Sequence, residues 1–178
     1  GEDIAAKTVI VPMGVNLEKF RRKVPYAPWS GNGPARLISV GRLNPCKGHD
    51  DLIRAIGCLR DRSIEVRLSI AGEDELGGFG YRKILQALIE DLDLSDHVEL
   101  LGAVDEDTIR RRLIESHLFV LASHHEPLGV AIMEAMAVEL PVLVAAGGGV
   151  SELIDDQIDG LIFPDRRPVQ IASSIENL

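Results

Sequence analysis

Residues 118–145 read LFVLASHHEPLGVAIMEAMAVELPVLVA, an apolar strand, an apolar helix and a second apolar strand. The strands expected over 118–121 and 141–145 are continuously apolar, which is typical of parallel strands covered on both faces. The helix expected over 127–138 has only one ionisable residue, Glu134, so we expect it to be buried. This stretch therefore predicts a β-α-β unit with Glu134 inside it.

The rest of the chain repeats the alternation. We expect strands over 8–12, 35–40, 65–71, 98–101 and 160–163. We expect helices over 48–61 and 81–92. A third helix should follow an acidic cap at Asp105 or Asp107, a short fourth one should begin at Ser151, and a fifth should begin at residue 169. Residues 21–34 hold three prolines and two glycines, a composition that predicts a loop. The pattern indicates an α/β fold with a doubly wound, Rossmann-like parallel sheet.

Composition narrows the class of protein. The 178 residues carry a net charge of −9, whereas a nucleic-acid-binding surface needs a basic face. No apolar run approaches the roughly 18 residues of a membrane-spanning helix. Cys46 and Cys58 form no C-x-x-C motif, so a reducing, cytoplasmic setting fits. Because the chain opens on Gly1 and stops within an expected helix, we interpret residues 1–178 as one domain excised from a longer protein.

Glu134 has no side-chain partner among its chain neighbours. A lone buried carboxylate is unfavourable by several kcal/mol unless it is paired or hydrogen-bonded. Two interpretations stay open at this point: an internal salt bridge to a distant Arg or Lys, or hydrogen bonds to a hydroxyl-rich ligand.

Five consecutive strand ends carry glycine, charge or both: 41–42, 72–73, 102, 123–126 and 147–149. In doubly wound sheets, ligands bind outside the carboxyl ends of the strands. Arg42 and Lys47 suit phosphate oxygens, with pairing to surface acids as the alternative. The glycines at 147–149 let backbone amides approach an anion, with a plain turn as the alternative. Cations together with Glu126 and Glu134 indicate a nucleotide diphosphate sugar.

The motifs in chain order are PMGVNLEKF, SVGRLNPCKGHDDLIRA, SIAGEDE, LGAV, EPLGVAIMEAMAVELPVLVAAGGGVSELI and DGLIFP. Together they resemble the C-terminal, donor-binding domain of retaining GT-B glycosyltransferases of family 4 and the glycogen-synthase type. The resemblance covers nearly the whole chain. It implies a hexosyltransferase that uses a UDP- or GDP-sugar and a saccharide or lipid-linked acceptor, in polysaccharide or glycoconjugate synthesis.

The resemblance also implies roles for single residues. Arg42 and Lys47, after Gly41, would bind the diphosphate, and Glu126 the donor-sugar hydroxyls. Glu134 would hold the ribose, the amides of Val130 and Ala131 a phosphate, and the backbone at Val104 the base. Leu128 stands where the motif most often has an aromatic residue, which leaves the sugar open.

Such enzymes keep the anomeric configuration and need no metal ion or other cofactor. They bind the acceptor through an N-terminal domain that is not in these residues, so we expect the isolated domain to be inactive. A cytoplasmic protein is expected, with the inner face of the membrane as an alternative for the full-length enzyme.

Other classes remain for comparison. His124, His125 and Glu126 cannot all face one way from an extended segment, so we expect no metal site there. A dinucleotide-dependent oxidoreductase would need G-x-G-x-x-G after its first strand, and 41–43 do not supply it. A nucleotide-sugar epimerase of GT-B fold and a non-catalytic sugar-nucleotide binding module are the nearer alternatives.

Overall fold

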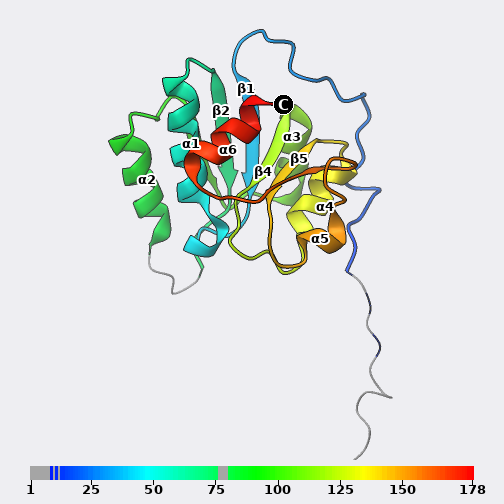
Figure 1. The fold of residues 1–178 in the computed structure, drawn as a ribbon. Helices are drawn as coiled ribbons and strands as arrows, with labels where there is room; N and C mark the ends of the chain where they lie inside the picture. The colour runs from blue at the N-terminus through cyan, green and yellow to red at the C-terminus, as the bar shows by residue number, and fades with distance from the viewer. Residues whose placement is uncertain (1–8, 10, 12, 76–79) are drawn as a thin grey trace, which may run out of the picture.

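The computed structural model describes residues 9, 11, 13–75 and 80–178, in which six strands alternate with six α-helices (Figure 1). The strands are β1 (Ala35–Val40), β2 (Val66–Ala71), β3 (Val98–Gly102), β4 (Leu118–Leu121), β5 (Val142–Ala145) and β6 (Leu161–Phe163). The helices are α1 (His49–Asp61), α2 (Tyr81–Asp91), α3 (Glu106–Glu115), α4 (Val130–Ala137), α5 (Val150–Leu153) and α6 (Pro168–Glu176), and a short 3₁₀ turn, η2 (Pro45–Lys47), precedes α1.

The six strands form one sheet in the order β3-β2-β1-β4-β5-β6, and every pairing is parallel. From β1 the chain moves outward to β2 and β3, and then returns to the middle and moves the other way from β4. The predicted doubly wound parallel sheet is confirmed. Between β1 and β4 the direction of winding reverses, and in such sheets this reversal opens a crevice at the carboxyl ends of the strands.

Helices cover both faces of the sheet (Figure 1). Leu37 and Ile38 are adjacent on β1 and point to opposite faces, as alternation along a strand requires. Leu37 belongs to an apolar cluster with α1, α2 and α6, and Ile38 to a second cluster with α3, α4 and α5. Because both side chains are almost fully buried, β1 is apolar on both faces, as the sequence indicated.

The helix of the opening stretch is shorter than predicted. It begins at Val130 rather than at residue 127, because Gly129 has a left-handed backbone with φ of 75° and ends the preceding loop. The predicted Asp105 cap is present, since its side chain accepts a hydrogen bond of 2.8 Å from the Thr108 amide. Most of the strand expected over 8–12 lies outside the described residues, and its described members, Val9 and Val11, are exposed and not in a strand.

Candidate functional site

A crevice of about 270 Å³ lies at the carboxyl ends of β1 and β4, where the winding of the sheet reverses. The segments that follow these two strands and the start of α4 form its walls. Its lining includes seven of the residues that the sequence analysis selected: Gly41, Arg42, Lys47, Glu126, Val130, Ala131 and Glu134. Residues separated by more than 90 positions therefore share one pocket, because all parallel strands end at the same edge of the sheet.

The loop after β1 is fixed against the loop after β2. Leu43 donates a backbone hydrogen bond of 3.0 Å to Glu73, and Gly41 donates one of 3.0 Å to Ala71. Gly72 has φ of 151°, and a Cβ there would overlap the carbonyl oxygen of Gly41. The close approach of the two loops therefore requires glycine at position 72.

Arg42 extends from this loop into the lining of the pocket and remains accessible. Its side chain is 70% exposed, and its Nη1 lies 2.5 Å from Oε1 of Glu75. The sequence analysis gave no role to Glu75. The structure makes Glu75 the direct partner of a predicted phosphate-binding residue.

Lys47 reaches across the crevice from the end of η2. Its Nζ lies 2.7 Å from Oε2 of Glu126, with side-chain exposures of only 16% and 10%. The turn is anchored to the segment after β4, because the His124 amide donates to the Cys46 carbonyl at 2.7 Å. Two residues expected to bind adjacent parts of a ligand, the diphosphate and the sugar, are thus paired with each other in the free protein.

Besides the Lys47 contact, two backbone amides donate hydrogen bonds to Glu126. Its Oε1 accepts from the Gly129 amide at 3.1 Å, and its carbonyl accepts from the Gly149 amide at 2.7 Å. Gly148 forms a parallel bridge with Glu126, and a Cβ on Gly148 would overlap the Glu126 backbone. The glycines at 147–149 therefore pack against the chain at Glu126, and the Gly149 amide is already used by protein.

Glu134 is the least satisfied polar group of the pocket. It is half-buried rather than buried as predicted, because it lies on the face of α4 that borders the crevice. At the same edge, Leu128 before α4 and Val130 at its start are 42% and 37% exposed. Burial is the main cause that raises the pKa of the Glu134 carboxyl, and the charge of Glu106 adds to it. Within the described part of the chain, no cation lies within salt-bridge distance of it.

The first turn of α4 presents open backbone donors. The amides of Val130 and Ala131 have no hydrogen-bond acceptor among the described residues, as expected for the first turn of a helix. These amides carry the positive end of the helix dipole and can accommodate an anion.

Val104 is the one predicted site residue that does not line the crevice. It is half-buried in the short link between β3 and α3. The next residues, Asp105 and Glu106, line a separate hollow of about 450 Å³, where Glu106 accepts a hydrogen bond of 2.9 Å from Lys19. The structure thus places Val104 outside the lining of the crevice.

His49 was missed by sequence reasoning. It begins α1 behind the loop at Gly41, is fully buried, and neither ring nitrogen reaches an acceptor or donor in hydrogen-bonding geometry among the described residues. Burial lowers the pKa of its imidazole to about 4, and the Lys47 charge contributes, against the raising effect of the backbone at Arg42 and Gly41. The signal in the sequence was a histidine directly after Gly48, at the start of an apolar helix face.

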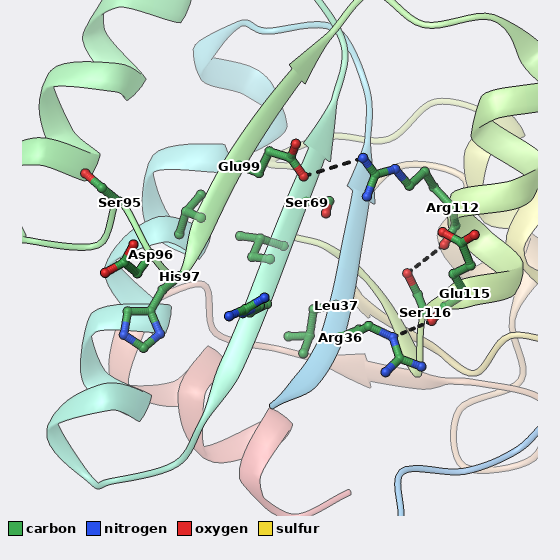
Figure 2. A pocket seen from close by; sticks show the side chains of 13 residues that line it. Arg36, Leu37, Ser69, Ser95, Asp96, His97, Glu99, Arg112, Glu115 and Ser116 are labelled. Atoms are coloured by element: carbon green, nitrogen blue, oxygen red, sulfur yellow. Dashed lines mark hydrogen bonds and ion pairs between the residues drawn. The ribbon is translucent and has the colours of Figure 1, made fainter. Parts of the chain in front are cut away.

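A second polar hollow, also of about 270 Å³, lies near the amino ends of β1 to β3 (Figure 2). Its charged lining consists of three arginines and three acids: Arg36, Arg67, Arg112, Asp96, Glu99 and Glu115. Arg36 donates to the Glu115 carbonyl at 2.6 Å, and Arg112 lies 3.7 Å from Glu99. These balanced contacts fasten α3 to the sheet and favour a structural role for this hollow.

Neither metal nor membrane features appear in the described residues. No group of three His, Cys, Asp or Glu side chains there could hold a metal ion. The closest feature is His124, whose Nε2 lies 3.4 Å from Oδ2 of Asp51. In the same part of the chain, no helix has the length and apolar character needed to cross a bilayer.

Residues 28–178 match the family model described as glycosyl transferases group 1. The chain belongs to this family. The resemblance predicted from the motifs is confirmed at the level of family and fold. Over 167 residues, this group 1 chain is 34% identical to the amylovoran biosynthesis glycosyltransferase AmsK of Erwinia amylovora, covering 90% of this chain and 39% of that protein.

Solved structures of similar fold include those of two further proteins. Anabaena Alr3699/HepE in complex with UDP and glucose has a TM-score of 0.78 at 24% identity, over 92% of this chain and 45% of that one. The C-terminal domain of the group 1 protein LpcC from Francisella tularensis has a TM-score of 0.77 at 23% identity. The match covers 93% of this chain and 87% of the LpcC domain. The group 1 chain thus spans less than half the length of AmsK and HepE and most of the LpcC domain.

Proposed function

We propose that this chain is the donor-binding half of a retaining glycosyltransferase. The enzyme would move a hexose-type sugar from a UDP- or GDP-sugar to a saccharide or lipid-linked acceptor in polysaccharide or glycoconjugate synthesis, in the cytoplasm or at the inner face of the membrane. The observation that supports it most is one crevice at the winding reversal of the sheet, lined by two cations, two carboxylates and an open helix N-terminus.

Each part of the crevice suits one part of such a donor. Arg42, Lys47 and the free amides of Val130 and Ala131 provide positive groups for a diphosphate. Glu134, which has no protein partner in the described residues, offers acceptor oxygens to the ribose hydroxyls. Of the two alternatives left open for Glu134, its lack of a partner favours the ligand.

Glu126 is the residue that we assign to the sugar. Its carboxylate is held in place by Lys47 and the Gly129 amide, which limits the entropy lost when it binds a hydroxyl. When the bond from the anomeric carbon to the diphosphate breaks, the electron pair passes to the leaving phosphate oxygen. The positive groups around the diphosphate would stabilise that developing charge without a metal ion.

The acceptor requires residues beyond a donor site. Transfer needs a second substrate held in attack geometry within a closed site. We therefore expect the 178 residues alone to bind a donor and to release no nucleoside diphosphate when incubated with acceptors. Turnover by this chain at a rate typical of a whole enzyme would contradict the assignment of the site.

A thermal-shift panel of nucleotide sugars tests the proposal. At about 100 times its Kd, a ligand adds about 2.7 kcal/mol of stability, which raises Tm by roughly 5–10 °C in a domain of this size. A UDP- or GDP-sugar should give such a shift, and Glu134→Gln should reduce it. If every nucleotide sugar leaves Tm unchanged, the donor site is wrongly placed. Product analysis with the full-length enzyme then separates a transferase from an epimerase or a binding module.

A further inference from the structure

The crevice contains an imbalance of charge when its neighbour Glu75 is included. Arg42 and Lys47 are balanced by Glu126 and Glu134 within the lining, and the whole chain has a net charge of −9. A nucleoside diphosphate adds further negative charge to this site. A carboxylate that pairs with one of these cations and has no contact of its own with the ligand therefore competes with the ligand for that cation.

Glu75 is such a carboxylate. It does not line the crevice, yet its Oε1 lies 2.5 Å from Nη1 of Arg42. Among the described residues, its other contact is a long hydrogen bond of 3.4 Å from the Asn44 side chain. Its position opposite Arg42 is fixed by backbone pairing, because Leu43 and Asp74 form a parallel bridge between the two loops.

We propose that Glu75 is an internal competitor of the donor diphosphate. Its carboxylate occupies the guanidinium of Arg42 in the free protein and has to leave before phosphate oxygens can take the same donors. On product release the exchange runs in reverse, and Glu75 returns to Arg42 as the nucleoside diphosphate departs. This inference rests on the proposed donor site and adds to it a residue that sets affinity.

A positioning role for Glu75 predicts the opposite change in nucleotide affinity. If Glu75 instead positioned Arg42 for the phosphate, removal of its charge would weaken binding. The two side chains are 70% and 46% exposed, so the pair is accessible to solvent and readily exchanged. Exposed ion pairs are worth about 0.2–1 kcal/mol, which corresponds to roughly a 1.4-fold to fivefold change in affinity.

Calorimetric titration of UDP and GDP into the 178-residue chain tests the proposal. Glu75→Gln keeps the size of the side chain and should tighten binding about twofold to fivefold at low salt. The gain should shrink near 1 M salt, where the screening length falls to about 3 Å. In an Arg42→Ala background, Glu75→Gln should have no effect, because the group it releases is absent.

Glu73→Gln is the matched control. It removes the same charge from the same loop, but Glu73 pairs with Arg82 at 3.3 Å and does not contact Arg42. Weaker or unchanged binding by Glu75→Gln, an equal gain from Glu73→Gln, or a gain that persists without Arg42 would each overturn the proposal. If Arg42→Ala weakens binding while Glu75→Gln has no effect, the donor site stands and this inference alone fails. If no variant binds either nucleotide, both fail.

Discussion

Lys47 and Glu126 form an ion pair of 2.7 Å across the crevice, although 79 positions separate them in the chain. The pair joins the turn before α1 to the loop before α4. Because each side chain is largely shielded from solvent, neither charge can be removed without consequence for the other. If both residues contact the donor as proposed, ligand binding and stability are linked at this pair.

Removing Lys47 should destabilise the free protein. Lys47→Ala leaves Glu126, which is 8% exposed, as an unpaired carboxylate, and we expect a loss of about 1–3 kcal/mol in the free energy of unfolding. Urea denaturation measures it. The double variant with Glu126→Gln should recover part of the loss, and an unchanged stability of Lys47→Ala would show that the pair contributes nothing.

The cations should distinguish a nucleoside diphosphate from its nucleoside. A charge-assisted hydrogen bond is worth roughly 1.5–3 kcal/mol, so Arg42→Ala and Lys47→Ala should each weaken a nucleoside diphosphate about tenfold to a hundredfold. The bare nucleoside should bind almost unchanged. Equal losses for both ligands in calorimetry would remove these residues from the phosphate subsite.

Substitution of the two glutamates of the crevice should weaken the binding of different ligands. Glu134→Gln is expected to weaken UDP or GDP itself, because Glu134 is assigned to the ribose. Glu126→Gln should retain nucleotide binding and weaken the complete nucleotide sugar. Titration of both ligands into both variants separates the roles, and intact nucleotide affinity in Glu134→Gln would show that the carboxylate has a structural role.

Gly48 should tolerate no side chain. It has φ of 63°, and a Cβ there would overlap the carbonyl of Ala122 on the segment after β4. Strain of the left-handed backbone and overpacking together predict a loss of about 2–4 kcal/mol for Gly48→Ala. Gly14→Ala is the control, since nothing lies within 4 Å of a Cβ at that position. Equal stabilities of the two variants by chemical denaturation would contradict this packing.

Stability should depend on pH through His49. Its folded-state pKa of about 4 lies below the ordinary value of 6.5, so the unfolded chain takes up a proton first as pH falls. The contribution is fully present above about pH 6.5 and is lost toward pH 4, up to about 3 kcal/mol. His49→Gln should flatten this part of the pH profile, while the exposed His125, changed to Gln, serves as control. A slope that persists in His49→Gln would assign the effect to other groups.

The parallel sheet and the grouping of site residues at one edge of it could be predicted from the sequence, whereas local details could not. Apolar strands such as 118–121 and the alternation with helices define a parallel sheet, and a parallel sheet brings every strand end to one edge. That geometry is why Gly41 and Glu126 could be expected together before any coordinates. The start of α4 was misplaced because the left-handed backbone at Gly129 is a local choice that periodicity does not reveal.

Side-chain pairing was the part that sequence reasoning could not supply. The partners of Arg42 and Lys47 depend on how two loops pack, and the sequence offers many acids near each. The half-exposure of Glu134 depends on which face of α4 borders the crevice. His49 was overlooked because its place after Gly48, at the start of an apolar helix face, does not reveal that its ring lies buried behind the loop at Gly41.

The winding reversal between β1 and β4 means that the side chains of the site come from two separate segments of the chain. Arg42 and Lys47 belong to the segment that follows β1, and Glu126 and Glu134 to the segment that follows β4. Under the proposed donor assignment, exchange of the segment after β4 between family members would change the contacts of Glu126 with the sugar and would keep Arg42 and Lys47 for the diphosphate. The exchanged segment has to keep Glu126 or an equivalent partner for Lys47, because this ion pair joins the two segments.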